Sequence, residues 1–184
     1  LVGARVAAER GLDYGGIALV AIVASVSGGT LRNIFLGLKP ILITDPWIIG
    51  SVIVAVAITL SVRRITKIGK TLLIMDTLGL AIATASGVQL AHNLNSSWYA
   101  TIILGVITAV TGGLLRDVLC QLEPVLLHRE TIGTSCLAGS LVYVSCHYFS
   151  VNEVLSVVLA SSCVILVREL SIKYDWHLPK VGGK

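Results

Sequence analysis

Two arginines in apolar surroundings are the residues of this chain best suited to chemistry. Arg32 and Arg116 each follow a pair of adjacent glycines by about one helical turn, at the end of an apolar run long enough to cross a membrane. A guanidinium keeps its charge and needs a partner or water inside a bilayer, while paired glycines weaken a helix. The combination predicts a narrow polar pathway near the membrane midplane, with fixed charges at or near its constriction.

The motif occurs twice, with 84 residues between Gly28 and Gly112. The copies are Ser27-Gly28-Gly29-Thr30-Leu31-Arg32-Asn33 and Thr111-Gly112-Gly113-Leu114-Leu115-Arg116-Asp117. We expect both helices to be broken at the glycine pairs, because unwound carbonyls and the hydroxyls of Ser27 and Thr111 can then coordinate a cation. The residues expected to line an ion pathway are Ser27, Gly28, Gly29, Thr30, Arg32, Asn33, Asp76, Thr111, Gly112, Gly113, Arg116 and Asp117.

These assignments have structural alternatives. Glycine pairs also allow neighbouring helices to approach closely, and an arginine can bond carbonyls at a helix end. A single pair would favour packing, whereas two copies, each followed by an arginine and later a proline, favour a functional site. Asp76, near the start of an apolar run, is equally well explained as an interfacial helix cap.

The composition is that of a membrane protein. Hydrophobic residues make up 55% of the chain, charged residues 13%, and the mean hydropathy is +0.89; soluble domains carry about a quarter charged residues. The net charge of +4 comes from loop residues, so it does not indicate nucleic-acid binding. Phosphate-loop, nucleophile and HExxH motifs are missing from the sequence, which argues against an enzyme. The four cysteines and four histidines lack zinc-ligand spacing, so we expect buried thiols, no tightly bound metal and no cofactor.

Apolar runs between polar segments predict one all-α transmembrane domain over residues 1–184. The expected spans are 14–38, 47–62, 72–90, 98–122, 131–149 and 154–167, followed by a polar tail at 173–184. The repeat implies one earlier helix, of which residues 1–9 are expected to be the end. Two three-helix repeats, 1–62 and 72–149, then precede an unpaired helix at 154–170. An odd number of spans inverts the second repeat relative to the first.

The basic residues predict the orientation. Eleven lysines and arginines fall on one face of this topology, one (Lys39) falls on the other, and Arg32 and Arg116 lie inside. Because short cytoplasmic loops are enriched in lysine and arginine, the basic face and the C-terminus are expected in the cytoplasm.

At these motifs the chain resembles the prokaryotic TRIC (trimeric intracellular cation) channel family, a group also labelled putative glycine transporters. The family pattern is Gly-Gly-Gly-x-x-Arg-Asp in the second and fifth helices, and the segments Met75-Asp76-Thr77-Leu78-Gly79-Leu80 and Leu122-Glu123-Pro124-Val125-Leu126-Leu127 are also similar. This chain departs from the pattern at Ser27, Thr111 and Asn33; the last change removes a carboxylate that would attract cations.

The resemblance implies seven helices, a homotrimer in the inner membrane, and a potassium and sodium pathway through each subunit. Three functions stay open: a monovalent cation channel, a secondary transporter of a small zwitterion such as glycine, and a lipid-binding or assembly protein whose glycines serve packing alone.

Overall fold

The computed structural model describes residues 2–40, 43, 46–61, 69–122 and 131–174. Within them the chain forms seven helices and no strand. The helices are α1 (Val2–Glu9), α2 (Tyr14–Phe35), α4 (Pro46–Ser61), α5 (Gly69–Asn93), α6 (Trp98–Leu119), α8 (Thr131–Tyr148) and α9 (Glu153–Lys173). The all-α polytopic fold predicted from the apolar runs is confirmed. The tail beyond Tyr174 and the loops at 62–68 and 123–130, with most of the predicted cytoplasmic charge, lie outside the described residues.

Local chemistry explains several helix ends. Asp13 caps α2 by accepting a hydrogen bond from the Gly16 backbone N–H at 2.7 Å, and Asn152 caps α9 through the Val154 N–H at 2.9 Å. Four of the described helices are long and apolar enough to cross a membrane: Tyr14–Phe35, Leu73–Asn93, Trp98–Leu119 and Glu153–Lys173. The last helix ends at Lys173, three residues beyond the predicted helix 154–170, because Arg168 is buried rather than a solvated stop signal.

The repeat is visible in the backbone. Helices α2 and α6 both have 22 residues, and α6 begins and ends 84 residues after α2. Each is followed by the same turn, in which Gly37 (φ 69°) corresponds to Gln121 (φ 50°). The next residues, Leu38 and Leu122, both donate a 2.8 Å backbone hydrogen bond to the helix end, one to the Asn33 carbonyl and the other to the Asp117 carbonyl. The two halves therefore share one backbone design.

One prediction about these helices is wrong. Both α2 and α6 continue without interruption through Gly28-Gly29 and Gly112-Gly113, so neither is broken at its glycine pair. A glycine pair interrupts a helix only where other groups replace the lost backbone bonds. Here the glycines serve another purpose, close contact between the two helices.

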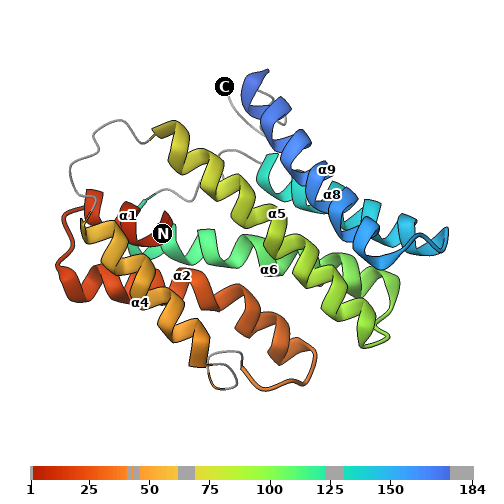
Figure 1. Ribbon diagram of the computed structural model, residues 1–184, viewed down its shortest axis with the longest axis horizontal. Helices are drawn as coiled ribbons and strands as arrows, with labels where there is room; N and C mark the ends of the chain where they lie inside the picture. The colour runs from red at the N-terminus through yellow and green to blue at the C-terminus, as the bar shows by residue number, and fades with distance from the viewer. Residues whose placement is uncertain (1, 41–42, 44–45, 62–68, 123–130, 175–184) are drawn as a thin grey trace, which may run out of the picture.

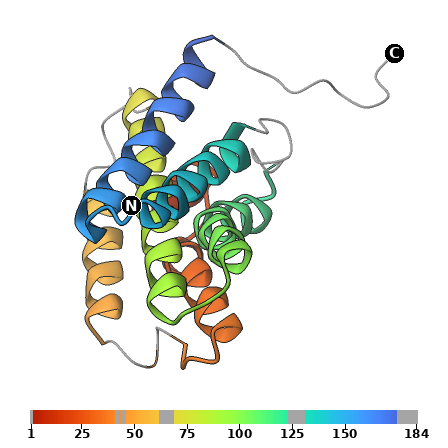
Figure 2. The same ribbon diagram turned by 90° about the vertical axis from the view of Figure 1, so that its right-hand side faces the viewer.

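Helix α6 occupies the middle of the molecule (Figures 1 and 2), packed against α2, α5 and α8. Helices α1 and α4 flank α2, while α9 covers α8 and α5. Small residues permit these contacts: a side chain on Gly87 would meet the Cα of Gly105, and one on Gly139 would meet the Ala160 carbonyl oxygen at 2.9 Å. Such packing is the usual means of association between membrane helices, since lipid offers no hydrophobic driving force.

Exposed aromatic side chains lie where α4 and α6 begin and where α8 ends. They are Trp47, Trp98, Tyr99, Tyr148 and Phe149. Tyr14 and Tyr174 are exposed where α2 begins and α9 ends. Aromatic residues favour the two boundaries between membrane and water, so these positions define a bilayer frame for the helices.

Candidate ion pathway

The crossing of α2 and α6 is reciprocal. A side chain on Gly28 would collide with the carbonyl oxygen of Thr108, and one on Gly112 would collide with the carbonyl oxygen of Ala24. Ala24 and Thr108 are themselves equivalent positions of the repeat. A contact in which each partner uses the same patch is what a two-fold axis produces. The first glycine of each pair is thus needed for helix contact.

Arg116 sits in an ionic cluster. Its Nη1 donates to Asp76 Oδ1 at 2.9 Å, and its Nε donates to Asp117 Oδ1 at 2.8 Å. Arg116 is 8% exposed and Asp117 is 3% exposed, so the cluster is largely removed from solvent. Neither interpretation of Asp76, as a pathway residue or as a helix cap, included this ion pair, which joins α5 to α6.

Arg32, at the equivalent position of the first repeat, has only neutral partners among the described residues. Its Nε and Nη2 donate to Asn33 Oδ1 at 3.2 and 3.1 Å, and its Nη1 donates to Ser86 Oγ at 2.9 Å. The Asn33 amide in turn donates to the Lys39 carbonyl at 3.0 Å. Arg32 is also buried, with 6% exposure, and it joins α2 to α5.

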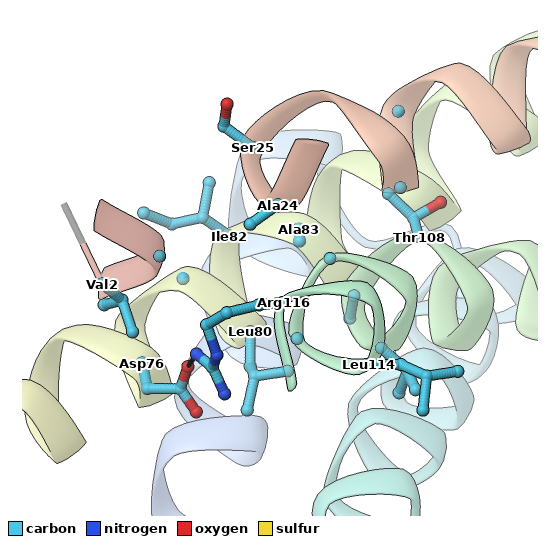
Figure 3. A pocket seen from close by; sticks show the side chains of 18 of the residues that line it. Val2, Ala24, Ser25, Asp76, Leu80, Ile82, Ala83, Thr108, Leu114 and Arg116 are labelled. Atoms are coloured by element: carbon cyan, nitrogen blue, oxygen red, sulfur yellow. Dashed lines mark hydrogen bonds and ion pairs between the residues drawn. The ribbon is translucent and has the colours of Figure 1, made fainter. Parts of the chain in front are cut away.

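Between the two arginines lies a cavity of about 650 Å³, bounded by α1, α2, α5 and α6. Both guanidiniums and both carboxylates contribute to its wall, and the remaining wall is mostly small or aliphatic. In Figure 3 the Arg116 side chain reaches toward Asp76, while Ala24 and Thr108 lie near the helix crossing. The cavity is therefore a weakly polar space with one group of charges around Arg116 and a second charge at Arg32.

The structure brings together eight of the twelve predicted pathway residues. The cavity is lined by Gly28, Gly29, Arg32, Asp76, Gly112, Gly113, Arg116 and Asp117. Ser27, Thr30, Asn33 and Thr111 do not contribute to its wall. The Thr111 hydroxyl donates to the Ile107 carbonyl of its own helix at 2.6 Å, while the Ser27 hydroxyl is buried with no hydrogen-bond partner among the described residues.

The polar contacts of Ser86 and Arg168 are among those that escaped the sequence analysis. Ser86 is one residue of a long apolar helix, and only its position on α5 makes it a partner of Arg32. Arg168, counted with the cytoplasmic charges, is 1% exposed and donates from Nη1 to the Thr131 hydroxyl at 3.0 Å. This bond ties α9 to the start of α8. The available signal for a buried Arg168 was its position directly after the apolar run 154–167.

An inverted helical repeat that crosses at paired glycines and encloses a charged cavity defines a polytopic membrane transport protein. The model of the family described as "Glycine transporter" matches residues 1–64 and 73–148. The chain is also 30% identical over 180 residues to the UPF0126 inner membrane protein YadS of Escherichia coli strain K12, covering 96% of this chain and 86% of that protein. A UPF0126 membrane protein of Vibrio cholerae is 32% identical over 182 residues, covering 96% and 74%. This chain belongs to the glycine-transporter (UPF0126) family, and it is not an enzyme.

Solved structures of TRIC cation channels share the fold. One, from work on conductance through these channels, matches with a TM-score of 0.88 and 31% identity over 100% of this chain and 94% of that chain. The trimeric intracellular cation channel orthologue of Rhodobacter sphaeroides matches with a TM-score of 0.88 and 29% identity over 95% and 91%. The resemblance to the TRIC family seen in the motifs is thereby confirmed for the whole fold.

Proposed function

We propose that this protein is a channel for monovalent cations, potassium and sodium, with one pathway through each subunit of a homotrimer. The likeness to TRIC cation channels supports it. The observation that carries it is the Arg116 cluster, in which one guanidinium faces two carboxylates, Asp76 and Asp117. A bare guanidinium would repel a cation by about 4 kcal/mol at 4 Å and an effective dielectric of about 20. With two carboxylates beside it, that end of the pathway attracts cations instead.

Six of the twelve predicted pathway residues have a stated role in this proposal. Gly28 and Gly112 bring α2 and α6 together and so set the narrowest part. Arg32 and Arg116 hold these two helices to α5, rather than touching the ion. The carboxylates of Asp76 and Asp117 provide the attraction. Neither hydroxyl of the motifs, on Ser27 or on Thr111, lines the cavity, and neither is assigned an ion contact.

Glycine transport is the second candidate, because the matching family model carries that description. A carrier of glycine would hold its carboxylate on a guanidinium and its ammonium on a carboxylate. Arg32 binds α5 at Ser86, and Asp76 lies ten residues earlier on the same helix, a rise of about 15 Å. Glycine separates its nitrogen from its carboxylate carbon by about 2.5 Å. One glycine therefore cannot bridge the Arg32 end and the Asp76 end. At the other end the Arg116 guanidinium is already paired with Asp76 and Asp117, so a glycine carboxylate would have to displace them. Both points favour the channel.

Two measurements on one preparation decide between these functions. The purified protein is placed in planar bilayers with a potassium chloride gradient, and the same protein is tested for uptake of labelled glycine into vesicles. Discrete openings that reverse near the potassium equilibrium potential support the channel. Saturable glycine uptake without such openings supports the carrier and overturns the channel.

The assembly and orientation belong to the same proposal. We expect homotrimers in the prokaryotic inner membrane, surrounded by lipid, with the C-terminus in the cytoplasm. The unpaired helix α9 exposes apolar side chains, among them Val154, Val158 and Leu166. In this proposal they complete the surface of the subunit that faces lipid or a neighbouring subunit. Native mass spectrometry in mild detergent should give trimers. Monomers or dimers alone would contradict this assembly.

A further inference from the structure

We propose that the pathway rectifies: cation current passes more readily from the Asp117 end toward the Arg32 end than in reverse, and Asn33 is the residue that creates the difference. This inference rests on the proposed channel function. It follows from a comparison of two sites that share one backbone design and differ in charge.

At the Arg116 end the positive charge is offset. One guanidinium is held by two carboxylates, at 2.9 Å from Asp76 and 2.8 Å from Asp117. Either carboxylate alone balances the charge of the guanidinium. A cation arriving at this end therefore meets no unbalanced positive charge from Arg116.

At the Arg32 end the buried charge opposes cations. The guanidinium donates to an amide oxygen on Asn33 and a hydroxyl on Ser86, and no described carboxylate lies within salt-bridge distance of it. The formal sum there is one positive charge. In both repeats the arginine donates a hydrogen bond to the side-chain oxygen of the next residue, Asn33 for Arg32 and Asp117 for Arg116. The neutral amide of Asn33 does not cancel the positive charge of Arg32.

The two ends are far enough apart to act separately. Their contacts on α5, at Asp76 and Ser86, are ten residues and about 15 Å apart along the helix. The barrier at Arg32 therefore lies toward one end of the membrane field. A cation that starts from the Asp117 end crosses most of the voltage before it meets the barrier, whereas one that starts from the Arg32 end crosses little.

The voltage scale makes the effect measurable. One elementary charge across 100 mV gains about 2.3 kcal/mol, so a barrier placed off-centre gives a current ratio of about threefold or more between +100 and −100 mV. In the predicted orientation, α2 ends at the outer face, so the larger current flows outward.

The test is the current–voltage relation of the full chain in bilayers with 1 M potassium chloride on both sides. At 1 M the screening length is about 3 Å, so exposed loop charges are suppressed while buried charges persist. The side carrying the C-terminus is found by protease treatment of a tag there. We expect outward current about threefold larger than inward at 100 mV.

Asn33→Asp adds a carboxylate beside Arg32 and should bring the ratio close to one. The matched control is Asn95→Asp, the same chemical change at an exposed position in the loop after α5. It should leave the ratio unchanged. Because Asn33→Asp also loses the hydrogen bond to the Lys39 carbonyl, Asp117→Asn is a second variant that reduces the charge difference from the other end.

The outcomes separate the two proposals. Openings with a linear current–voltage relation in the unmodified protein would overturn the rectification and leave the channel standing. A ratio that Asn33→Asp and Asp117→Asn leave unchanged would also overturn it. A protein that conducts no cations would remove the channel function, and this inference with it.

Discussion

Gly28 of α2 lies directly against the backbone carbonyl of Thr108 on α6, with no room for a side chain between them. The same relationship joins Gly112 to the carbonyl of Ala24. The second glycine of the later pair differs: a side chain on Gly113 would meet its nearest neighbour, Arg116 Nη2, only at 3.9 Å, which is ordinary contact. In the second pair, therefore, the close helix contact requires Gly112 and not Gly113.

Gly28→Ala and Gly112→Ala should each destabilise the protein, because a methyl group forced against backbone costs about 1–3 kcal/mol. Gly113→Ala is the matched control and should be tolerated. Thermal unfolding in detergent, followed by circular dichroism, measures the difference. Equal stability of Gly112→Ala and Gly113→Ala would show that the α2–α6 contact is looser than described.

Arg116→Ala should disturb folding or gating. The substitution leaves Asp76 and Asp117 without their shared cation in a largely buried place, and breaking a buried pair in this way costs about 3–5 kcal/mol. Size-exclusion chromatography and unfolding in detergent report the loss. If the variant instead formed stable trimers with greatly raised cation conductance, Arg116 would be an electrostatic barrier and the holding role assigned to it would be wrong.

Asp117→Asn should lower cation flux while leaving the assembly intact. The Arg32–Asn33 contact in the first repeat demonstrates that an amide oxygen can hold the guanidinium at 3.1 Å. A charge about 10 Å from a passing cation contributes about 1.7 kcal/mol at an effective dielectric of about 20, so a fall of up to about 20-fold is expected. Single-channel conductance measures it. Unchanged conductance would remove Asp117 from the pathway.

Thr131→Val should weaken the attachment of α9. The Thr131 hydroxyl accepts a 3.0 Å hydrogen bond from the buried Arg168 guanidinium, and hydrogen bonds to charged groups contribute about 1.5–3 kcal/mol. The control is Ser145→Ala, an exposed position on the same helix. Denaturant unfolding of the two variants should differ by that amount. Equal stability would mean that the hydrogen bond between Arg168 and Thr131 does not help to hold α9 in place.

The internal repeat explains why so much of the fold could be predicted. The 84-residue offset between the repeats and the polar segments between apolar runs predicted that α2 begins at Tyr14 and α6 at Trp98, as observed. The helix break was wrong because two adjacent glycines permit either a kink or a close contact, and only the neighbouring helix decides which. The division into repeats at 1–62 and 72–149 stays a prediction.

Partners of the charged groups were harder to predict. Asp76 and Ser86 lie on the same helix, and its apolar composition does not reveal which side faces α2 or α6. The burial of Arg168 depends on how α9 packs against α8, a contact without a counterpart in the repeat. Side-chain partners across helices follow from rotation and packing, which periodicity alone does not determine.

Helix α5 holds both arginines, Arg32 through Ser86 and Arg116 through Asp76. A rigid helix transmits displacement along its whole length, so a slide of α5 by a single turn, about 5.4 Å, would detach both guanidiniums at once. The two ends of the cavity are therefore mechanically coupled through α5, while Arg116 keeps its contact with Asp117 and Arg32 keeps its contact with Asn33. A stimulus that moves this helix acts on both ends of the cavity at the same time.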